Sequence, residues 1–266
     1  MDRLTPWKGR KPMVGVIHLP PLPGSPGWEG SMAPVLERAV GEAVVLEEMG
    51  LDGVLVENFQ DAPFYPDSSP PETIAAMTLV VGTVRRNVEI PVGVNLLRND
   101  AQGALAVAAV TGGSFIRVNV HTGSMFTDQG LIQGRAHDTL RRRRILGTSV
   151  AILADVLVKH ATPPPGTVLE TAARDAWHRG LADGLILTGS ETGARVDPAE
   201  VARVKDALPP EGKVWVGSGT TPESVRELIR VADGIIVGSS LREGGRPGAP
   251  LDSHEVANLL AAAGRG

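Results

Sequence analysis

Two short segments near the end of the chain decide the fold: Lys213 to Thr220 reads KVWVGSGT, and Gly234 to Leu241 reads GIIVGSSL. Each is an apolar run, rich in Val or Ile, that breaks into glycine and hydroxyl residues. Such short apolar runs are typical of buried parallel strands. The small residues at their ends leave backbone N–H groups open to an anion, and the first end leads into a helix that starts at Pro222. We therefore expect a phosphate site formed by Gly217, Ser218, Gly219, Thr220, Gly238 and Ser239.

The rest of the chain supplies the strands that such a site needs. In an eight-stranded α/β barrel the phosphate site commonly follows strands seven and eight, so six strands should precede them. Apolar runs begin near Val14, Gly53, Val92, Phe115, Val150 and Leu185, with helix-like segments between them and a long irregular stretch at 121–136. The 266 residues suit one such domain. The sequence predicts a single-domain (β/α)8 TIM barrel over residues 1–266, with an open doubly wound sheet as the competing fold.

Composition narrows the functional classes. The net charge of −4 argues against a nucleic-acid binder that relies on positive charge. The absence of Cys excludes thiolate chemistry and disulfides. The first residues, MDRLTPWKGRKP, lack the apolar core of a signal peptide, and no run is long enough to span a membrane. We expect a cytoplasmic protein that forms a homo-oligomer, with peripheral membrane association as an open alternative.

Polar residues at the predicted strand ends should converge on one pocket, as they do in barrel enzymes. Glu57 and Asp155 each end an apolar strand, where a partly desolvated carboxylate suits general acid–base work. The alternative is a structural salt bridge, for which Arg117 is the candidate partner. Lys159 suits a base, a Schiff-base nucleophile or a phosphate contact, and its alternative is a solvent-facing loop residue. The candidates for catalysis are Glu57, Asn95, Arg117, Asn119, Asp155, Lys159 and His160.

Three further patterns have weaker functional interpretations. His18, Glu57, Asp155 and His160 could bind a divalent metal, but they are scattered along the chain, and no other cofactor is indicated. The turn at 188–193, TGSETG, could extend the anion site or be an ordinary tight turn. The run Arg141 to Arg144 falls in a predicted helix, where neighbouring side chains diverge, so we expect a solvated face with one or two ion pairs. A surface for membranes or acidic partners is the alternative.

The segments together resemble the BtpA/SgcQ family. The matching stretches include VGVIHLPPLPGSP, DGVLVENFQDAPF, IPVGVNLLRND, FIRVNVHTGSMFTDQGLIQGRA, ILADVLVKHA and VADGIIVGSSL, in order along nearly the whole chain. The resemblance implies a ribulose-phosphate-binding type of barrel. One branch of the family is named for the biogenesis of photosystem I, and another lies among sugar-phosphotransferase genes. The resemblance assigns no reaction and no catalytic residue.

Two functions follow as hypotheses. The first is an enzyme that acts on a small phosphorylated compound, such as a sugar or ribosyl phosphate, by isomerisation, epimerisation or lyase chemistry. The second is a non-catalytic assembly or biogenesis factor that uses the barrel as a binding module. The density of polar residues at the strand ends favours the enzyme, whereas the family name favours the assembly factor.

Overall fold

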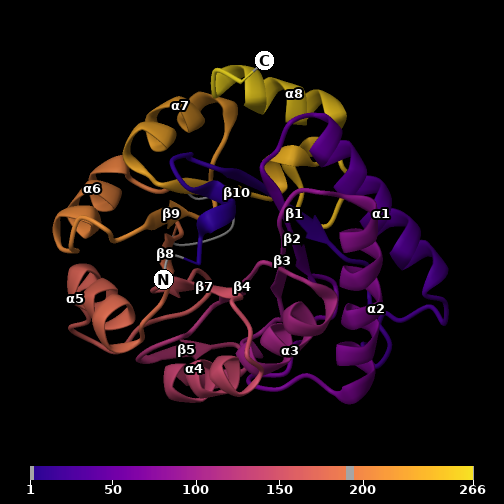
Figure 1. Ribbon diagram of the computed structural model, residues 1–266, viewed down its shortest axis with the longest axis horizontal. Coiled ribbons are helices and arrows are strands. Elements are labelled where there is room, and N and C mark those ends of the chain that lie inside the picture. The colour runs from indigo at the N-terminus through magenta and orange to yellow at the C-terminus, as the bar shows by residue number, and fades with distance from the viewer. Residues whose placement is uncertain (1–2, 190–194, 266) are drawn as a thin grey trace.

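The computed structural model describes residues 3–189 and 195–265 and contains a closed barrel of parallel strands. Helices surround the strands on all sides when the barrel is seen from one end (Figure 1). The strands follow one another around the barrel in chain order, and β10 pairs with β1 to close it, which excludes the open sheet. The barrel strands are β1 (Met13–His18), β2 (Gly53–Glu57), β3 (Val92–Asn95), β4 (Phe115–Val118), β7 (Ala151–Val156), β8 (Gly184–Leu187), β9 (Val214–Val216) and β10 (Gly234–Val237). The predicted TIM barrel is confirmed.

Each barrel strand is followed by a helix, and several helices begin at a clear chemical signal. Asp100 Oδ1 accepts a hydrogen bond of 2.8 Å from Gly103 N, and Asp197 and Asp252 cap later helices in the same way. Proline occupies the first turn of four helices among the described residues, where its missing N–H costs nothing. The helices are α1 (Ala33–Glu48), α2 (Pro71–Asn87), α3 (Ala101–Thr111), α4 (Ala136–Ile145), α5 (Leu169–Arg174), α6 (Pro198–Asp206), α7 (Pro222–Val231) and α8 (Ser253–Ala262).

The strands are buried on both faces, which explains their continuous apolar sequences. Their outward side chains pack against the helices in one large cluster, and a smaller cluster fills the barrel centre. Gly93 makes room for the ring of Phe115 there, since a Cβ on Gly93 would lie 2.2 Å from that ring. Trp7 lies in the 3₁₀ turn η1 (Thr5–Trp7) and packs edge-on against Phe115 and Trp215, with 5.2 Å between ring centroids in each pair. The N-terminal segment therefore packs into one end of the barrel, and the opposite end is left for a site.

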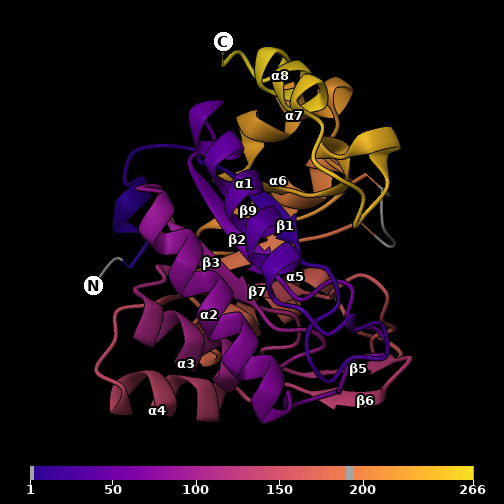
Figure 2. The ribbon, with the colours of Figure 1, turned by 90° about the vertical axis from the view of Figure 1, so that its right-hand side faces the viewer.

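The stretch 121–136 differs from its prediction as an irregular loop. It contains a hairpin of β5 (Ser124–Thr127) and β6 (Gly130–Gln133), which lies at the end of the molecule away from the N-terminus (Figure 2). Met125 and Ile132 face inward in this hairpin, while Phe126 and Leu131 are exposed. Each strand has only four residues, so the alternation of apolar and polar side chains is too short to be recognised in the sequence.

Two other expectations have clear outcomes. The arginine run forms the exposed face of α4 except for Arg143, which is buried and donates to Asp183 Oδ2 over 2.5 Å. The interpretation as a solvated face with one or two ion pairs is confirmed. Helix α5 ends at Arg174, and the chain continues directly as the π-helical turn η2 (Asp175–Arg179). No helix among residues 3–189 and 195–265 is both long and apolar enough to cross a membrane.

Candidate functional site

A cavity of about 120 Å³ opens at the carboxyl ends of the barrel strands. It brings together most of the residues that the sequence predicts for the site, from both halves of the chain. Those that line it are His18, Glu57, Arg117, Asn119, Lys159, His160, Gly217, Ser218, Gly219, Thr220, Gly238 and Ser239. Asn95 and Asp155 do not line it and lie behind the residues that do.

Three neighbouring strands end in a row of polar side chains beside this cavity. The strand register places His18 opposite Glu57 and Glu57 opposite Asn95. Asn95 Nδ2 donates to Glu57 Oε2 over 2.5 Å, and His18 Nε2 lies 4.0 Å from Glu57 Oε1. One carboxylate oxygen of Glu57 is therefore held by a neighbouring amide, while the other faces His18 and the cavity. This arrangement fixes a carboxylate where it can accept a proton from a ligand.

Asp155 forms a salt bridge with Arg117, which is the structural alternative to a catalytic role. Its carboxylate accepts from Arg117 Nε and Nη2 at 3.1–3.2 Å and from Asn119 Nδ2 at 2.7 Å. The Asp155 side chain is fully buried. Burial by itself would lower the pKa of Arg117, but the nearby carboxylates of Asp155 and Glu57 raise it above its ordinary value. Asp155 thus holds Arg117 and Asn119, and these two side chains reach the cavity.

Lys159 lines the same cavity, and its amine is close enough to Arg117, Glu57 and Asp155 for their charges to act on it. Burial lowers the pKa of Lys159, and the positive charges of Arg117 and Arg98 lower it further, against the opposing effect of Glu57 and Asp155. Its main chain is held on both sides: Lys159 N donates to Thr188 Oγ1 over 3.1 Å, and its carbonyl accepts from Arg98 Nη2 over 2.9 Å. A positioned amine with a lowered pKa can act as a base or as a nucleophile toward a carbonyl group.

The two glycine-rich strand ends meet along one wall of the cavity. Gly219 has a φ of +68°, which a residue with a side chain rarely adopts, and a Cβ on Gly217 would lie 2.3 Å from Ile186 Cγ2. Ser240 Oγ donates to the Thr220 carbonyl over 2.6 Å and so ties one turn to the other. Ser218 Oγ accepts from Gly189 N over 3.1 Å and links them to the end of β8. The wall presents small residues and backbone, as an anion site requires.

The sequence also predicted that the turn at 188–193 could extend the anion site and that four residues could bind a metal ion. Thr188 and Gly189 contact the site as described, whereas Ser190 to Gly193 of that turn lie outside the described residues. In the described part of the chain, no three His, Asp or Glu side chains are placed to hold a metal ion together. His18 and Glu57 are neighbours, but the carboxylate of Asp155 already binds Arg117 and Asn119. The residues present therefore do not fit a metal centre of the four candidates.

Comparison with known proteins places the chain in a family. The family model of the BtpA family matches residues 9–265. The chain belongs to the BtpA family. It is 46% identical over 267 residues to the photosystem I biogenesis protein BtpA of Synechocystis, covering 100% of this chain and 92% of that protein.

Solved structures similar to this BtpA family chain share its fold at low sequence identity. A tryptophan synthase structure from M. tuberculosis matches with a TM-score of 0.61 and 18% identity, covering 100% of both chains. A thiamine phosphate pyrophosphorylase from Pyrococcus furiosus matches with a TM-score of 0.58 and 15% identity, covering 99% of this chain and 96% of that one. These likenesses independently support the barrel architecture.

Several residues of this BtpA family site were not among the sequence candidates. Arg98 and Phe59, both in loops just beyond strand ends, line the cavity, as do Phe64 and Leu97. Other polar residues near the rim hold loops instead: Asn58 accepts from Leu97 N over 2.8 Å, and His121 Nε2 contacts the Gly180 carbonyl at 2.8 Å. The strand-end pattern cannot separate these roles, because a loop side chain can turn either inward or toward another loop.

Proposed function

We propose that the protein is an enzyme that acts on a small phosphorylated metabolite, such as a sugar or ribosyl phosphate. One observation supports the proposal: Lys159 and the two glycine-rich strand ends line the same cavity. The phosphate would bind at Gly217, Ser218, Gly219, Thr220, Gly238 and Ser239. The name of the similar P. furiosus pyrophosphorylase, which includes a phosphate compound, supports this choice.

The polar groups opposite the phosphate wall suit isomerase, epimerase or lyase chemistry. Glu57 offers a fixed carboxylate, and Lys159 offers an amine with a lowered pKa. Either would remove a proton from a carbon next to a carbonyl group, or Lys159 would add to that carbonyl as a Schiff base. Arg117 and Asn119, held by Asp155, would bind oxygen atoms of the substrate. His160 lines the same cavity and would contact the ligand at its outer side.

A labelling experiment with pyridoxal phosphate tests this function, because that compound joins a phosphate to an aldehyde. Treatment with pyridoxal phosphate and then borohydride should label Lys159 first, since Lys159 lines the same cavity as the proposed phosphate wall. Inorganic phosphate should protect Lys159 from labelling. The other four lysines, Lys8, Lys11, Lys205 and Lys213, are internal controls. Labelling spread evenly over all five, or unaffected by phosphate, would rule out the proposed site.

A non-catalytic biogenesis factor is the second candidate, and the name of the Synechocystis relative favours it. The two candidates differ in their response to small ligands. A sugar phosphate present at 100 times its dissociation constant should stabilise an enzyme of the proposed class by about 2.7 kcal/mol in a thermal-shift panel. A barrel that serves only as an assembly module should keep its melting temperature unchanged across the panel.

A further inference from the structure

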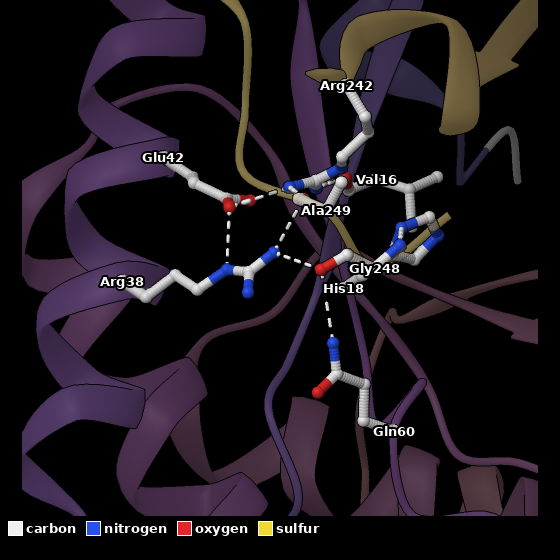
Figure 3. A network of polar contacts seen from close by, with 8 residues as sticks. All are labelled: Val16, His18, Arg38, Glu42, Gln60, Arg242, Gly248 and Ala249. Atoms are coloured by element: carbon white, nitrogen blue, oxygen red, sulfur yellow. Dashed lines mark hydrogen bonds and ion pairs between the residues drawn. The ribbon is translucent and has the colours of Figure 1, made fainter. Parts of the chain in front are cut away.

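The segment that follows β10 is fixed to the first helix by a buried polar network (Figure 3). Arg242 is completely buried, and its guanidinium donates to Glu42 Oε1 over 2.6 Å and to the Val16 carbonyl over 2.5 Å. Arg38 donates to the same oxygen of Glu42 over 2.9 Å. Two arginines from different segments therefore share one carboxylate, and the segment after β10 is held against α1 and β1.

The same network holds the peptide at Gly248. Arg38 Nη2 donates to the carbonyls of Gly248 and Ala249 over 2.8 and 2.7 Å, and Gln60 Nε2 donates to the Gly248 carbonyl over 3.1 Å (Figure 3). Gly248 has a φ of +79°, so a side chain there would be strained. Gly248 N then donates to His18 Nδ1 over 3.2 Å. The network thus ends on one nitrogen of a ring that lines the cavity.

This hydrogen bond fixes the position of the proton on His18. A backbone N–H only donates, so Nδ1 must accept and carries no proton. The proton of the neutral ring is then on Nε2, which faces the cavity side. Nε2 lies 4.0 Å from Glu57 Oε1 and 3.4 Å from the place of a Cβ on Gly238. The ring of Phe59 packs on the imidazole with 4.3 Å between centroids. The Nε2–H group therefore lies between the proposed phosphate wall and Glu57.

The surroundings of His18 keep its ring uncharged. Burial lowers the pKa of His18 well below its ordinary value, and the positive charges of Arg242, Lys159, Arg38 and Arg117 lower it further. Among the described residues, Glu57 from the neighbouring strand is an acidic group that faces the ring.

We infer that His18 is a catalytic residue that acts as a neutral hydrogen-bond donor, from Nε2, to an oxygen atom of the bound phosphorylated compound. This inference rests on the proposed function. In the step where Glu57 or Lys159 takes a proton from carbon, negative charge develops on the adjacent oxygen, and the His18 donor stabilises it while keeping its own proton. A neutral donor is suited to this because it does not first need to be charged in a positively charged pocket. Arg38 is a positioning residue that acts through the Gly248 carbonyl, and Arg242 is one that acts through Glu42, the carboxylate that it shares with Arg38.

Nitrogen-15 NMR of the histidine rings tests the inference directly. The protein has 6 histidines, and the His18→Gln variant identifies the His18 signals. We expect a neutral ring with the proton on Nε2 at about pH 6.5, the ordinary pKa of histidine, and above. Adding inorganic phosphate at constant pH should shift the His18 Nε2 signal without changing the tautomer. A proton on Nδ1, or a charged ring at pH 6.5, would overturn the inference.

The phosphate titration separates this inference from the proposed function. If phosphate moves the amide signals of Ser218 and Gly219 but leaves His18 unchanged, the phosphate site stands and the role of His18 falls. If phosphate moves neither, both fall. Replacing His18 by Leu should slow the labelling of Lys159 by pyridoxal phosphate by about 3- to 10-fold, because the aldehyde oxygen loses its hydrogen-bond donor, while Gln, which keeps a donor, should retain most of the rate. Equal losses in the two variants would contradict a donor role.

A matched pair of arginine variants tests the positioning residues. Arg38→Gln removes the hold on Gly248 and should give His18 a mixture of the two tautomers. The control is Arg135→Gln, which removes an arginine that pairs with Asp138 at the start of α4 rather than on α1. This variant should leave the His18 signals unchanged. Both variants are compared at temperatures where circular dichroism shows them folded. An unchanged tautomer in Arg38→Gln would show that the network does not position His18.

Discussion

Asn95 Nδ2 donates a hydrogen bond of 2.5 Å to Glu57 Oε2, between buried groups at the ends of neighbouring strands. Replacing Asn95 by Ala removes this donor and leaves a buried carboxylate oxygen without a partner. We expect the free energy of unfolding to fall by about 1–3 kcal/mol, measured by urea denaturation. Asn87→Ala is the matched control, since its amide caps an exposed helix end by donating to the Thr83 carbonyl. Equal stability of the two variants would contradict a structural role for the Asn95–Glu57 bond.

Breaking the buried ion pair of Arg117 and Asp155 should lower the free energy of unfolding more than Asn95→Ala does. Arg117→Met leaves the fully buried carboxylate of Asp155 without its cation, so we expect a loss of about 3–5 kcal/mol in the free energy of unfolding. Adding Asp155→Asn to this variant should recover part of the loss, because the uncompensated charge is gone. The exposed pair of Arg203 and Glu170 is the control, and Arg203→Met should cost far less stability than Arg117→Met, because water screens that pair. Additive losses in the double variant would show that the pair is not coupled.

These two pairs also show how far the sequence could predict the site. Glu57, Asn95, Arg117 and Asp155 were found because each lies at or next to the carboxyl end of an apolar strand, and these ends meet at one rim of a parallel barrel. Their separate roles depend on contacts between strands. Whether Asp155 faces a ligand or an arginine depends on how β4 and β7 pair and on the length of the side chains between them. Neither strand's own sequence specifies this pairing.

The network around His18 could not be predicted from the sequence, because it also depends on contacts between distant segments. Its final hydrogen bond joins residues 230 positions apart, and it depends on the backbone conformation of Gly248 in a loop with no periodic pattern. The strand-end rule placed His18 at the rim and suggested a metal ligand. The structure instead shows that Nδ1 is taken by a backbone N–H. A loop that closes onto the site from the far end of the chain gives no local signal of its target.

Replacing Lys159 by Met should stabilise the protein while removing its reactivity. Because the folded state lowers the pKa of Lys159, the charged amine is held there at a cost that an apolar side chain of similar length avoids. We expect the melting temperature to rise by about 2–4 °C, corresponding to about 1 kcal/mol, and labelling by pyridoxal phosphate to be lost. Lys205→Met removes a lysine that pairs with Asp233 at 3.0 Å and should give no such gain. A lower melting temperature for Lys159→Met would contradict this account.

Stability should fall as the pH drops below about 6.5, the ordinary pKa of histidine. His18 and His121 are both buried, and burial lowers the pKa of each, so the unfolded chain binds their protons before the folded chain does. Their contribution to stability is complete above pH 6.5 and is lost as the pH falls through the lowered values, by at most about 1.4 kcal/mol per pH unit for each group. Urea denaturation between pH 7.5 and 5 measures this slope. His18→Gln should flatten the slope by its own share and leave that of His121. A slope that is the same in His18→Gln as in the parent protein would mean that His18 is protonated as readily in the folded state as in the unfolded chain.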